Sequence, residues 1–231
     1  MVGATERQVS VGEAVQAMVL NALGFTTRPL YLTSEFFANK PLDRLLRPGL
    51  TAALLNDDSL GRALDILYEA GPTEIFAQVA SHALRLWGIQ HRFVHLDTTS
   101  LSVEGEYEWP EEPEGVRITH GYSRDRRPDL KQVVVALLTS YRSALPLWIQ
   151  ALDGNALDNH AFPKIVEAYI AHLQAGAMPY LVADSALYSE ANLQRLEGIR
   201  WLTRVPERIG LAQKMVEEVS AQEMQPADQE G

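Results

Sequence analysis

Hydrophobic positions in the first ninety residues recur with the period of an amphipathic helix. Two segments show this pattern clearly, 13–24 (EAVQAMVLNALG) and 59–71 (SLGRALDILYEAG). Gly24 and Gly71 are suited to end these helices, because glycine accepts the backbone conformation that follows a helix. Ser59 is suited to be the N-cap of the second helix, since its hydroxyl can accept a hydrogen bond from a backbone N–H in the first turn.

A third helix is predicted over 72–88, PTEIFAQVASHALRLWG. Pro72 stands near its start, where the missing N–H of proline costs no hydrogen bond. We expect one face of this helix to be buried, because its apolar residues recur at three- and four-residue intervals. That face contains Ile75, Phe76, Val79, Ala83, Leu84 and Trp87.

From Phe93 the pattern changes to short runs that are rich in β-branched and aromatic residues, which predicts strands. The five residues YRSAL are short enough to join the last two strands as a hairpin, so we expect antiparallel pairing there. The predicted strands are 92–103 (RFVHLDTTSLSV), 115–123 (GVRITHGYS), 131–140 (KQVVVALLTS) and 146–154 (PLWIQALDG).

An amphipathic helix follows over 162–176, with Pro163 near its first position and Gly176 as its stop. We expect its inward face to consist of Ile165, Val166, Tyr169, Ile170 and Leu173.

Two further strands follow that helix, the first within 178–188 (MPYLVADSALY) and the second within 199–206 (IRWLTRVP). Between them, Ser189 can cap a short helix over 190–198. The polar end of the chain, residues 221–231, is expected to be disordered.

The composition indicates a globular protein with a substantial core, because 46% of the 231 residues are hydrophobic. No apolar run approaches the roughly eighteen residues of a membrane-spanning helix, and the first ten residues lack the pattern of a signal peptide. We therefore expect a cytoplasmic protein without a membrane partner. Cysteine is absent, so any metal would be held by carboxylate or histidine ligands.

The net charge of −10 argues at first against nucleic acid as a partner, since phosphate groups bind Lys and Arg. The negative charge is concentrated in two segments, however. Segment 101–115 holds six Glu and no base, and the segment from Glu207 onward holds six acids and two bases. The rest of the chain is neutral, which leaves room for a local basic surface.

Two strands each end in an aspartate that small or hydroxyl residues follow: HLDTTS contains Asp97 and VADSAL contains Asp184. The helix between them allows the two strands to lie parallel, which would place both carboxylates at one edge of the sheet. Adjacent carboxylates repel unless they share a proton or bind divalent cations, and hard oxygen ligands select Mg²⁺ or Mn²⁺. The alternative is that each aspartate only caps the turn after its strand.

The order of these elements resembles the RNase H-like core of DDE transposases from bacterial insertion sequences. Several sequence blocks are also similar to those of one group of these transposases. The resemblance covers nearly the whole chain except about the last twenty residues. The blocks are LNDDSLGRALDILYEAGPTEIF, HLDTTS, HGYSRDRRPDLKQVVVALLTS, PLWIQALDGNALD, PYLVADSALYSEANLQRL and IRWLTRVPE.

The resemblance implies that Asp97 and Asp184 are the first two carboxylates of a catalytic triad. In the family these residues hold Mg²⁺ or Mn²⁺ for cleavage of the transposon end and for strand transfer into target DNA. The third carboxylate of the family is a Glu within a Tyr-x-x-Arg-x-x-x-Glu pattern. None of the eight tyrosines here has Arg three positions later, so the pattern is absent, and we expect the chain alone to be inactive in full transposition. Glu217 and Glu218 are weaker substitutes, since charged pairs on a helix usually face solvent.

A basic segment, SRDRRPDLK, precedes the strand at 131–140. Its cations are candidate contacts to the DNA backbone, because guanidinium groups match phosphate oxygens. The alternative is an exposed turn with local ion pairs, since the segment also contains two aspartates. The candidate DNA-binding residues are Arg124, Arg126, Arg127 and Lys131.

We therefore predict an α/β protein in which a helical N-terminal subdomain, 1–90, precedes an incomplete RNase H-like mixed sheet with flanking helices, 91–210. An acidic tail, 211–231, which we also expect to be disordered, completes the chain, and the chain resembles a transposase shortened at both ends. One hypothesis is a metal-dependent transposase that acts on transposon ends and target DNA, with Asp97 and Asp184 as catalytic residues. The other is a non-catalytic remnant that binds DNA or full-length transposase subunits, and self-association into a homo-oligomer fits both.

Overall fold

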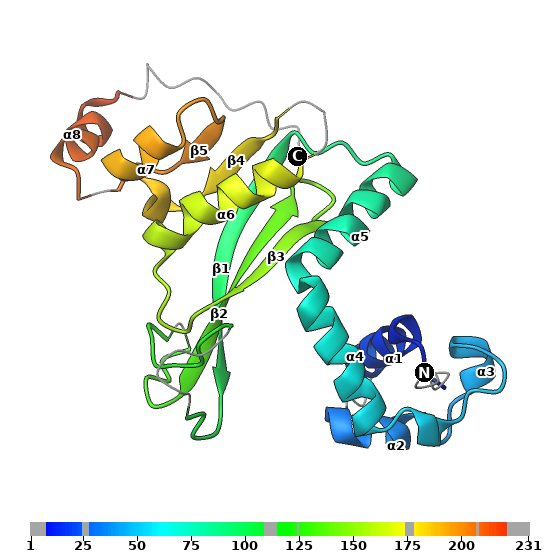
Figure 1. Cartoon of the computed structure of the whole chain (residues 1–231). Coiled ribbons are helices and arrows are strands. Elements are labelled where there is room, and N and C mark those ends of the chain that lie inside the picture. Colours follow the sequence, from blue (N-terminus) through cyan, green and yellow to red (C-terminus); the bar gives the residue numbers. More distant parts are fainter. Residues whose placement is uncertain are drawn as a thin grey trace, which may run out of the picture. The chain divides into compact units, whose positions relative to one another are not determined.

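The computed structural model describes residues 8–24, 28–108, 115–123, 125–173, 178–206 and 208–220 (Figure 1). The chain divides into two compact units, Met1–Ile75 and Phe76–Gly231. Each unit has hydrophobic clusters of its own, so the two are described separately. Among the described helices, none is both long and apolar enough to cross a membrane.

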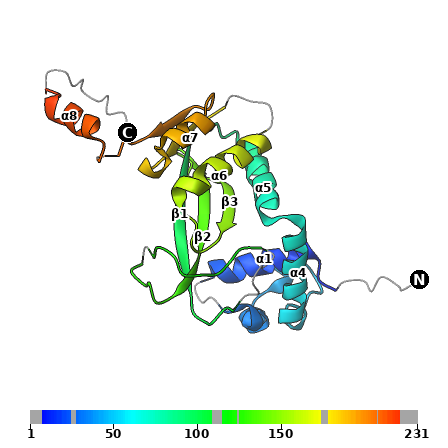
Figure 2. The same cartoon turned by 60° about the vertical axis from the view of Figure 1, so that its left-hand side comes forward.

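The N-terminal unit consists of helices around a small apolar core. Its elements are α1 (Val11–Leu23), η1 (Leu30–Leu32), α2 (Thr33–Phe37), α3 (Leu42–Leu45), η2 (Ala52–Leu54) and α4 (Asp57–Ala70). Phe36 and Phe37 are buried, with ring centroids 4.8 Å apart in an edge-to-face arrangement. Ala14 of α1 and Leu60 of α4 are buried where these two helices pack together (Figure 2). The two helices predicted in this region are therefore confirmed.

The start of α4 corrects one prediction. Asn56 is the N-cap, because its Oδ1 accepts a hydrogen bond from the backbone N–H of Ser59 at 2.9 Å. Asp57 and Asp58 already belong to the first turn, where negative charge is favourable next to the positive end of the helix dipole. Ser59 therefore lies inside the helix. The predicted stop is correct: Gly71 follows the helix with a φ of +82°.

We expect Asn56→Ala to lower the free energy of unfolding of the N-terminal unit by about 1 kcal/mol, because the cap of α4 is lost. Ser59→Ala is the matched control, with an expected change within about 0.5 kcal/mol, since the Ser59 hydroxyl lies outside the cap. Urea unfolding followed by circular dichroism measures both changes. A larger loss for Ser59→Ala than for Asn56→Ala would contradict this assignment.

The C-terminal unit is an α/β structure, which the helix α5 (Pro72–Trp87) leads into. Its strands are β1 (Phe93–Val103), β2 (Lys131–Ser140), β3 (Pro146–Leu152), β4 (Tyr180–Ala183) and β5 (Trp201–Thr203). Its further helices are α6 (Asp158–His172), η3 (Ser185–Leu187), α7 (Glu190–Arg195) and α8 (Gly210–Glu218).

The five strands form one sheet in the order β3-β2-β1-β4-β5. The first three strands pair antiparallel in sequence, so the predicted hairpin between β2 and β3 is confirmed. After α6 the chain returns on the other side of β1, where β4 pairs parallel with β1 and β5 pairs parallel with β4. This mixed topology with a helical crossover is the RNase H-like fold that the sequence predicts.

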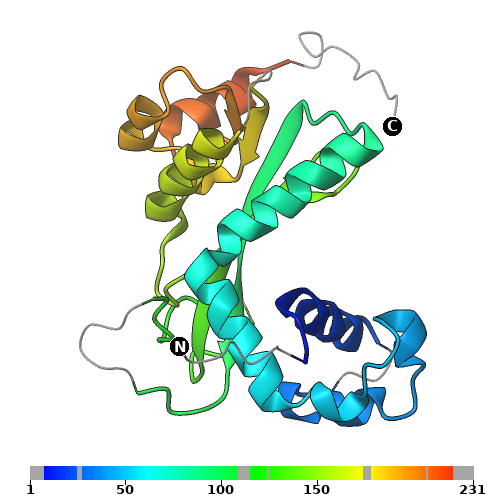
Figure 3. The same cartoon turned by 45° about the vertical axis from the view of Figure 1, so that its right-hand side comes forward.

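The main core lies between the sheet and its helices. Side chains of α6 cover one face of the sheet, and the C-terminal half of α5 lies on that same face (Figure 3). Val94, Leu96 and Leu138 point into this core from β1 and β2. The predicted inward residues Ile165, Val166 and Tyr169 of α6 are buried there, which confirms that face of the helix. The core residues of α6 are Phe162, Ile165, Val166 and Tyr169.

Segment 115–123 is not the strand that the sequence predicts. It makes an isolated antiparallel bridge, between Thr119 and Gln132, and otherwise runs as an irregular segment. The reason lies in two glycines: Gly121 lies against the backbone of Gly154, where a Cβ added to Gly121 would come within 1.9 Å of the Gly154 carbonyl oxygen. A close crossing of two backbone segments replaces a regular ladder here.

Two helix predictions also need correction. On α5, Val79 and Trp87 are 63% and 64% exposed, whereas the smaller Ala77 and Ala80 are buried, because alanine allows close packing of the helix on its neighbours. The helix α6 begins at Asp158, five residues before Pro163, with burial of Phe162 stabilising its first turn. The predicted stop at Gly176 lies outside the described residues. The predicted disordered tail, 211–231, is wrong in its first part, because α8 occupies Gly210–Glu218, and residues 221–231 lie outside the described residues.

Three further predictions of local structure in this unit are confirmed. Ser189 caps α7, since its hydroxyl accepts a hydrogen bond from the backbone N–H of Asn192 at 3.3 Å. The predicted last two strands correspond to β4 and β5.

Candidate active site

The two aspartates singled out in the sequence lie in β1 and directly after β4, two strands that pair in parallel. In the parallel pair of β1 and β4, Val94 lies opposite Leu181 and His95 lies opposite Val182. Extending this register by two residues, past Ala183 at the end of β4, would bring Asp97 level with Asp184. Neighbouring strands are about 4.8 Å apart, so the two carboxylates start from adjacent backbone positions on the same side of the sheet.

Strand alternation decides which way Asp97 faces. Leu96 and Thr98 are buried on the side of the main core, and Asp97 and Thr99 are exposed on the opposite side. His95 shares the side of Asp97, and its ring lies 5.8 Å from that of Tyr141. Asp97 is therefore a solvent-facing carboxylate in the middle of β1, and the prediction that this strand ends in the aspartate is wrong.

Asp184 reaches its place because β4 is only four residues long. The strand ends at Ala183, and Asp184 then caps η3, with Oδ1 accepting a hydrogen bond from the backbone N–H of Ala186 at 2.9 Å. The Thr203 hydroxyl donates to the Asp184 carbonyl oxygen at 2.5 Å, which ties this turn to β5. The capping alternative is thus realised for Asp184, and it uses one oxygen of the carboxylate.

The pair has the donor chemistry that a divalent cation requires. Asp97 Oδ1 accepts a hydrogen bond from the backbone N–H of Thr98 at 2.8 Å, and this bond helps to fix the orientation of the carboxylate. Carboxylate oxygens are the preferred ligands of Mg²⁺ and Mn²⁺, so the two aspartates fit as two ligands of one site. Within the described parts of the chain, no three His, Asp or Glu side chains gather closely enough to hold a metal ion. Glu217 and Glu218 are exposed on α8.

The predicted DNA-binding segment is partly neutralised by its own acids. Arg127 donates to both carboxylate oxygens of Asp129, at 2.7 Å from its terminal nitrogen, and this hydrogen bonding lowers the pKa of Asp129 and raises that of Arg127. Lys131 donates to the backbone carbonyl oxygens of Glu106 and Tyr107. Arg126 stands in the turn with a φ of +57°. Arg124 lies outside the described residues.

The structure also brings together three arginines that the sequence reading did not connect. Arg85, Arg92 and Arg200 line one pocket at the opposite ends of β1 and β4 from the aspartate pair. These arginines come from three separate segments, and none of the segments is a run of basic residues. No local sequence pattern therefore predicts that they lie together. A signal was available only in the topology, because residues that precede β1 and β5 lie at the same edge of a parallel sheet.

Comparison with known proteins places these features in a wider context. Residues 89–230 match the family model described as a transposase DDE domain, and residues 2–81 match one described as a domain of unknown function (DUF4277). No curated protein matches this chain significantly.

Three solved structures illustrate what the fold is similar to. The Mos1 transposase paired-end complex with left transposon end is 12% identical, with a TM-score of 0.34 over 88% of this chain and 60% of its own. The piggyBac transposase synaptic complex with hairpin DNA is 10% identical, with a TM-score of 0.47 over 98% and 48%. The Mos1 transposase catalytic domain with Raltegravir and Mn is 10% identical, with a TM-score of 0.32 over 67% and 74%. This chain thus spans 60% and 48% of the first two.

Proposed function

The chain belongs to the transposase DDE domain family, and we propose that it acts as an insertion-sequence transposase that cuts and joins DNA strands with the help of divalent cations. Asp97 and Asp184 are the proposed catalytic residues and metal ligands. The proposal keeps a helical part, 1–90, an RNase H-like part, 91–210, and an acidic tail, 211–231, although the boundary between the compact units lies earlier, between Ile75 and Phe76. Its proposed substrates are the ends of the transposon and a target DNA.

One observation supports this proposal: β1, which contains Asp97, pairs parallel with β4, which ends one residue before Asp184. Two carboxylates so placed repel each other, and a divalent cation between them removes the repulsion. Bound Mg²⁺ or Mn²⁺ would polarise the phosphoryl group and lower the pKa of a water molecule. The protein's part is to hold both carboxylates in place, through the backbone N–H groups of Thr98 and Ala186.

A second candidate function is binding without cleavage, to DNA or to subunits of a complete transposase. The observation that favours it is the donor count, since the described residues supply two carboxylates and no cluster of three metal-ligating side chains. Two protein ligands leave more of the coordination sphere to water, which weakens metal affinity and the positioning of the phosphate group.

Nicking of end-labelled DNA that carries the terminal repeats of the element separates the two functions. We expect the chain to nick this DNA with Mn²⁺ or Mg²⁺ and to leave it intact with EDTA, since the carboxylates act through the cation. DNA of the same length without the repeats is the control. Stable binding of the repeats without nicking in either metal would contradict the proposal and favour the second function.

A further inference from the structure

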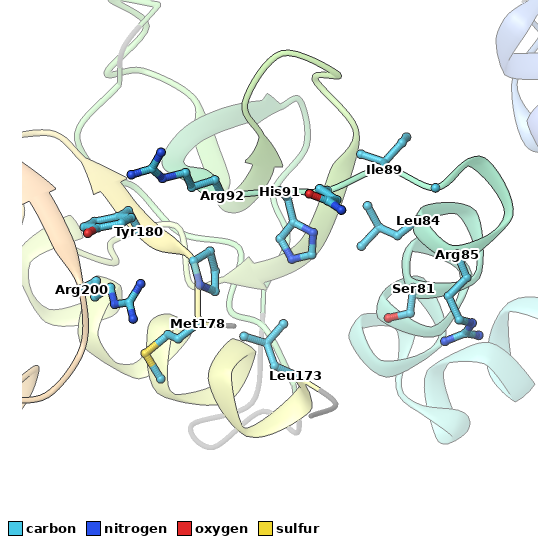
Figure 4. A pocket seen from close by; sticks show the side chains of 13 residues that line it. Ser81, Leu84, Arg85, Ile89, His91, Arg92, Leu173, Met178, Tyr180 and Arg200 are labelled. Carbon is cyan, nitrogen blue, oxygen red and sulfur yellow. The ribbon is translucent and has the colours of Figure 1, made fainter. Parts of the chain in front are cut away.

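A basic pocket lies at the ends of β1 and β4 that are opposite to Asp97 and Asp184. Its volume is about 960 Å³, and it is lined by the end of α5, the connection to β1, the segments that enter β4 and β5, and Leu173 after α6 (Figure 4). All of these segments belong to the C-terminal unit. The pocket is therefore a feature of one compact body.

The charges that line this pocket are of one sign. Arg85, Arg92 and Arg200 contribute cationic side chains, and none of the described lining residues is Asp or Glu. His91 also lines the pocket, and burial lowers its pKa, so it is neutral at physiological pH. The chain as a whole carries a net charge of −10, so a group of cations without acids is not expected from its average composition.

Two of the arginines lie close to the aromatic ring of Tyr180. The guanidinium carbons of Arg92 and Arg200 lie 5.9 Å and 5.4 Å from the centroid of Tyr180, and Figure 4 shows them above and below it. Tyr180 in turn stacks on Phe93, with ring centroids 5.3 Å apart. A guanidinium group within about 6 Å of an aromatic ring centroid is attracted by the negative face of the ring. Arg92 also lies 5.4 Å from the centroid of Phe93, so both arginines are placed beside one aromatic pair at the pocket.

This arrangement contrasts with the segment that the sequence marks as basic. There, Arg127 is paired with Asp129, and a neighbouring hollow of about 360 Å³ is lined by Glu106, Glu108 and Asp129 as well as by Lys131. Phosphate groups would meet nearby carboxylates in that hollow. In the basic pocket the described lining offers them arginines without such competition.

We propose that the basic pocket binds phosphodiester groups of the DNA on which the aspartate pair acts. The inference rests on the proposed function and adds a second contact site to it. Asp97 lies four positions after Phe93, the ring that stacks on the pocket residue Tyr180, which corresponds to about 13 Å at about 3.3 Å per residue. Successive nucleotides rise about 3.4 Å along a DNA strand, so the arginines bind backbone phosphates about four nucleotides from the aspartates.

The test is equilibrium binding of the full chain to a fluorescent DNA duplex in EDTA, measured by anisotropy over a range of NaCl concentrations. We expect Arg92→Ala/Arg200→Ala to weaken binding about tenfold, and to reduce the slope of log affinity against log salt by about 1.8, or about 0.9 for each lost phosphate contact. Arg92→Lys/Arg200→Lys keeps both charges and should keep most of the slope.

The matched control is Arg195→Ala/Lys214→Ala, which removes two exposed cations from the same unit, one of them already paired with Glu167. Circular dichroism verifies that each variant is folded. Equal binding by the pocket double variant and this control would overturn the inference. So would binding of inorganic phosphate that the pocket variant loses while its DNA affinity stays unchanged, because the pocket would then be a site for small anions.

Failure of the pocket inference can be distinguished from failure of the proposed function. Binding in EDTA requires no cation and no cleavage, so it reports on the arginines alone. If the unchanged chain does not nick DNA but Arg92→Ala/Arg200→Ala weakens DNA binding, the catalytic proposal is contradicted and the pocket inference stands. If the chain nicks DNA but this double variant binds DNA normally, the pocket inference is contradicted.

Discussion

Asp184→Asn is expected to reduce metal-dependent nicking by at least about a thousandfold, which corresponds to about 4 kcal/mol of transition-state stabilisation. Asparagine has the shape of aspartate and retains an oxygen that can accept the hydrogen bond from Ala186, so the cap of η3 remains. What changes is the negative charge that holds the cation next to Asp97. The expected loss is therefore catalytic rather than structural.

Asp97→Asn should lose as much, and the double variant should lose little more, because residues that act as one site are not additive. Asp65→Asn, an exposed aspartate on α4, is the control and should nick as the unchanged chain does. Initial rates on labelled DNA with Mn²⁺ measure all four. A residual rate above one tenth in either single variant would contradict the shared site.

Gly154→Ala is expected to destabilise the C-terminal unit by about 3 kcal/mol. A Cβ at this position would lie 2.0 Å from the carbonyl oxygen of Gln132 and 2.5 Å from that of Thr119. Both are backbone atoms of the bridge that joins 115–123 to β2, so no side-chain rotation relieves the clash. Gln132 is itself buried and donates from Nε2 to the carbonyl oxygen of Gly154 at 2.7 Å. The bridge and this hydrogen bond would be lost together.

Gly61→Ala on α4 is the matched glycine control, since no atom lies within 4 Å of its added Cβ. It should raise the free energy of unfolding by about 1 kcal/mol, because alanine is the better helix former. Urea unfolding of both variants gives the comparison. A loss below about 0.5 kcal/mol for Gly154→Ala would mean that the backbones cross less closely than described.

The strands and their order were predictable because local patterns and topology agree. β-branched runs marked β1 and β2, a five-residue connection fixed the hairpin, and the helix before β4 implied a parallel return. The proposed apposition of Asp97 and Asp184 rests on that return and on the length of each run before its aspartate. It needed no knowledge of side-chain packing.

The errors arose where tertiary contacts outweigh local preference. Segment 115–123 has the composition of a strand, yet Gly121 allows it to cross Gly154 instead of forming a ladder. On α5 the large apolar residues suggested the buried face, but Ala77 and Ala80 occupy it. The cluster of Arg85, Arg92 and Arg200 was beyond sequence reading, because the fold assembles it from distant segments.

Binding of Mn²⁺, followed by electron paramagnetic resonance of the free ion, tests the central claim that Asp97 and Asp184 form one metal site. The titration compares the unchanged chain with Asp97→Asn, Asp184→Asn and the control Asp65→Asn. The account predicts a site that either active-site substitution weakens by at least about tenfold, because each removes a charged ligand, and that the control leaves intact. Equal Mn²⁺ affinity in all four proteins would contradict it.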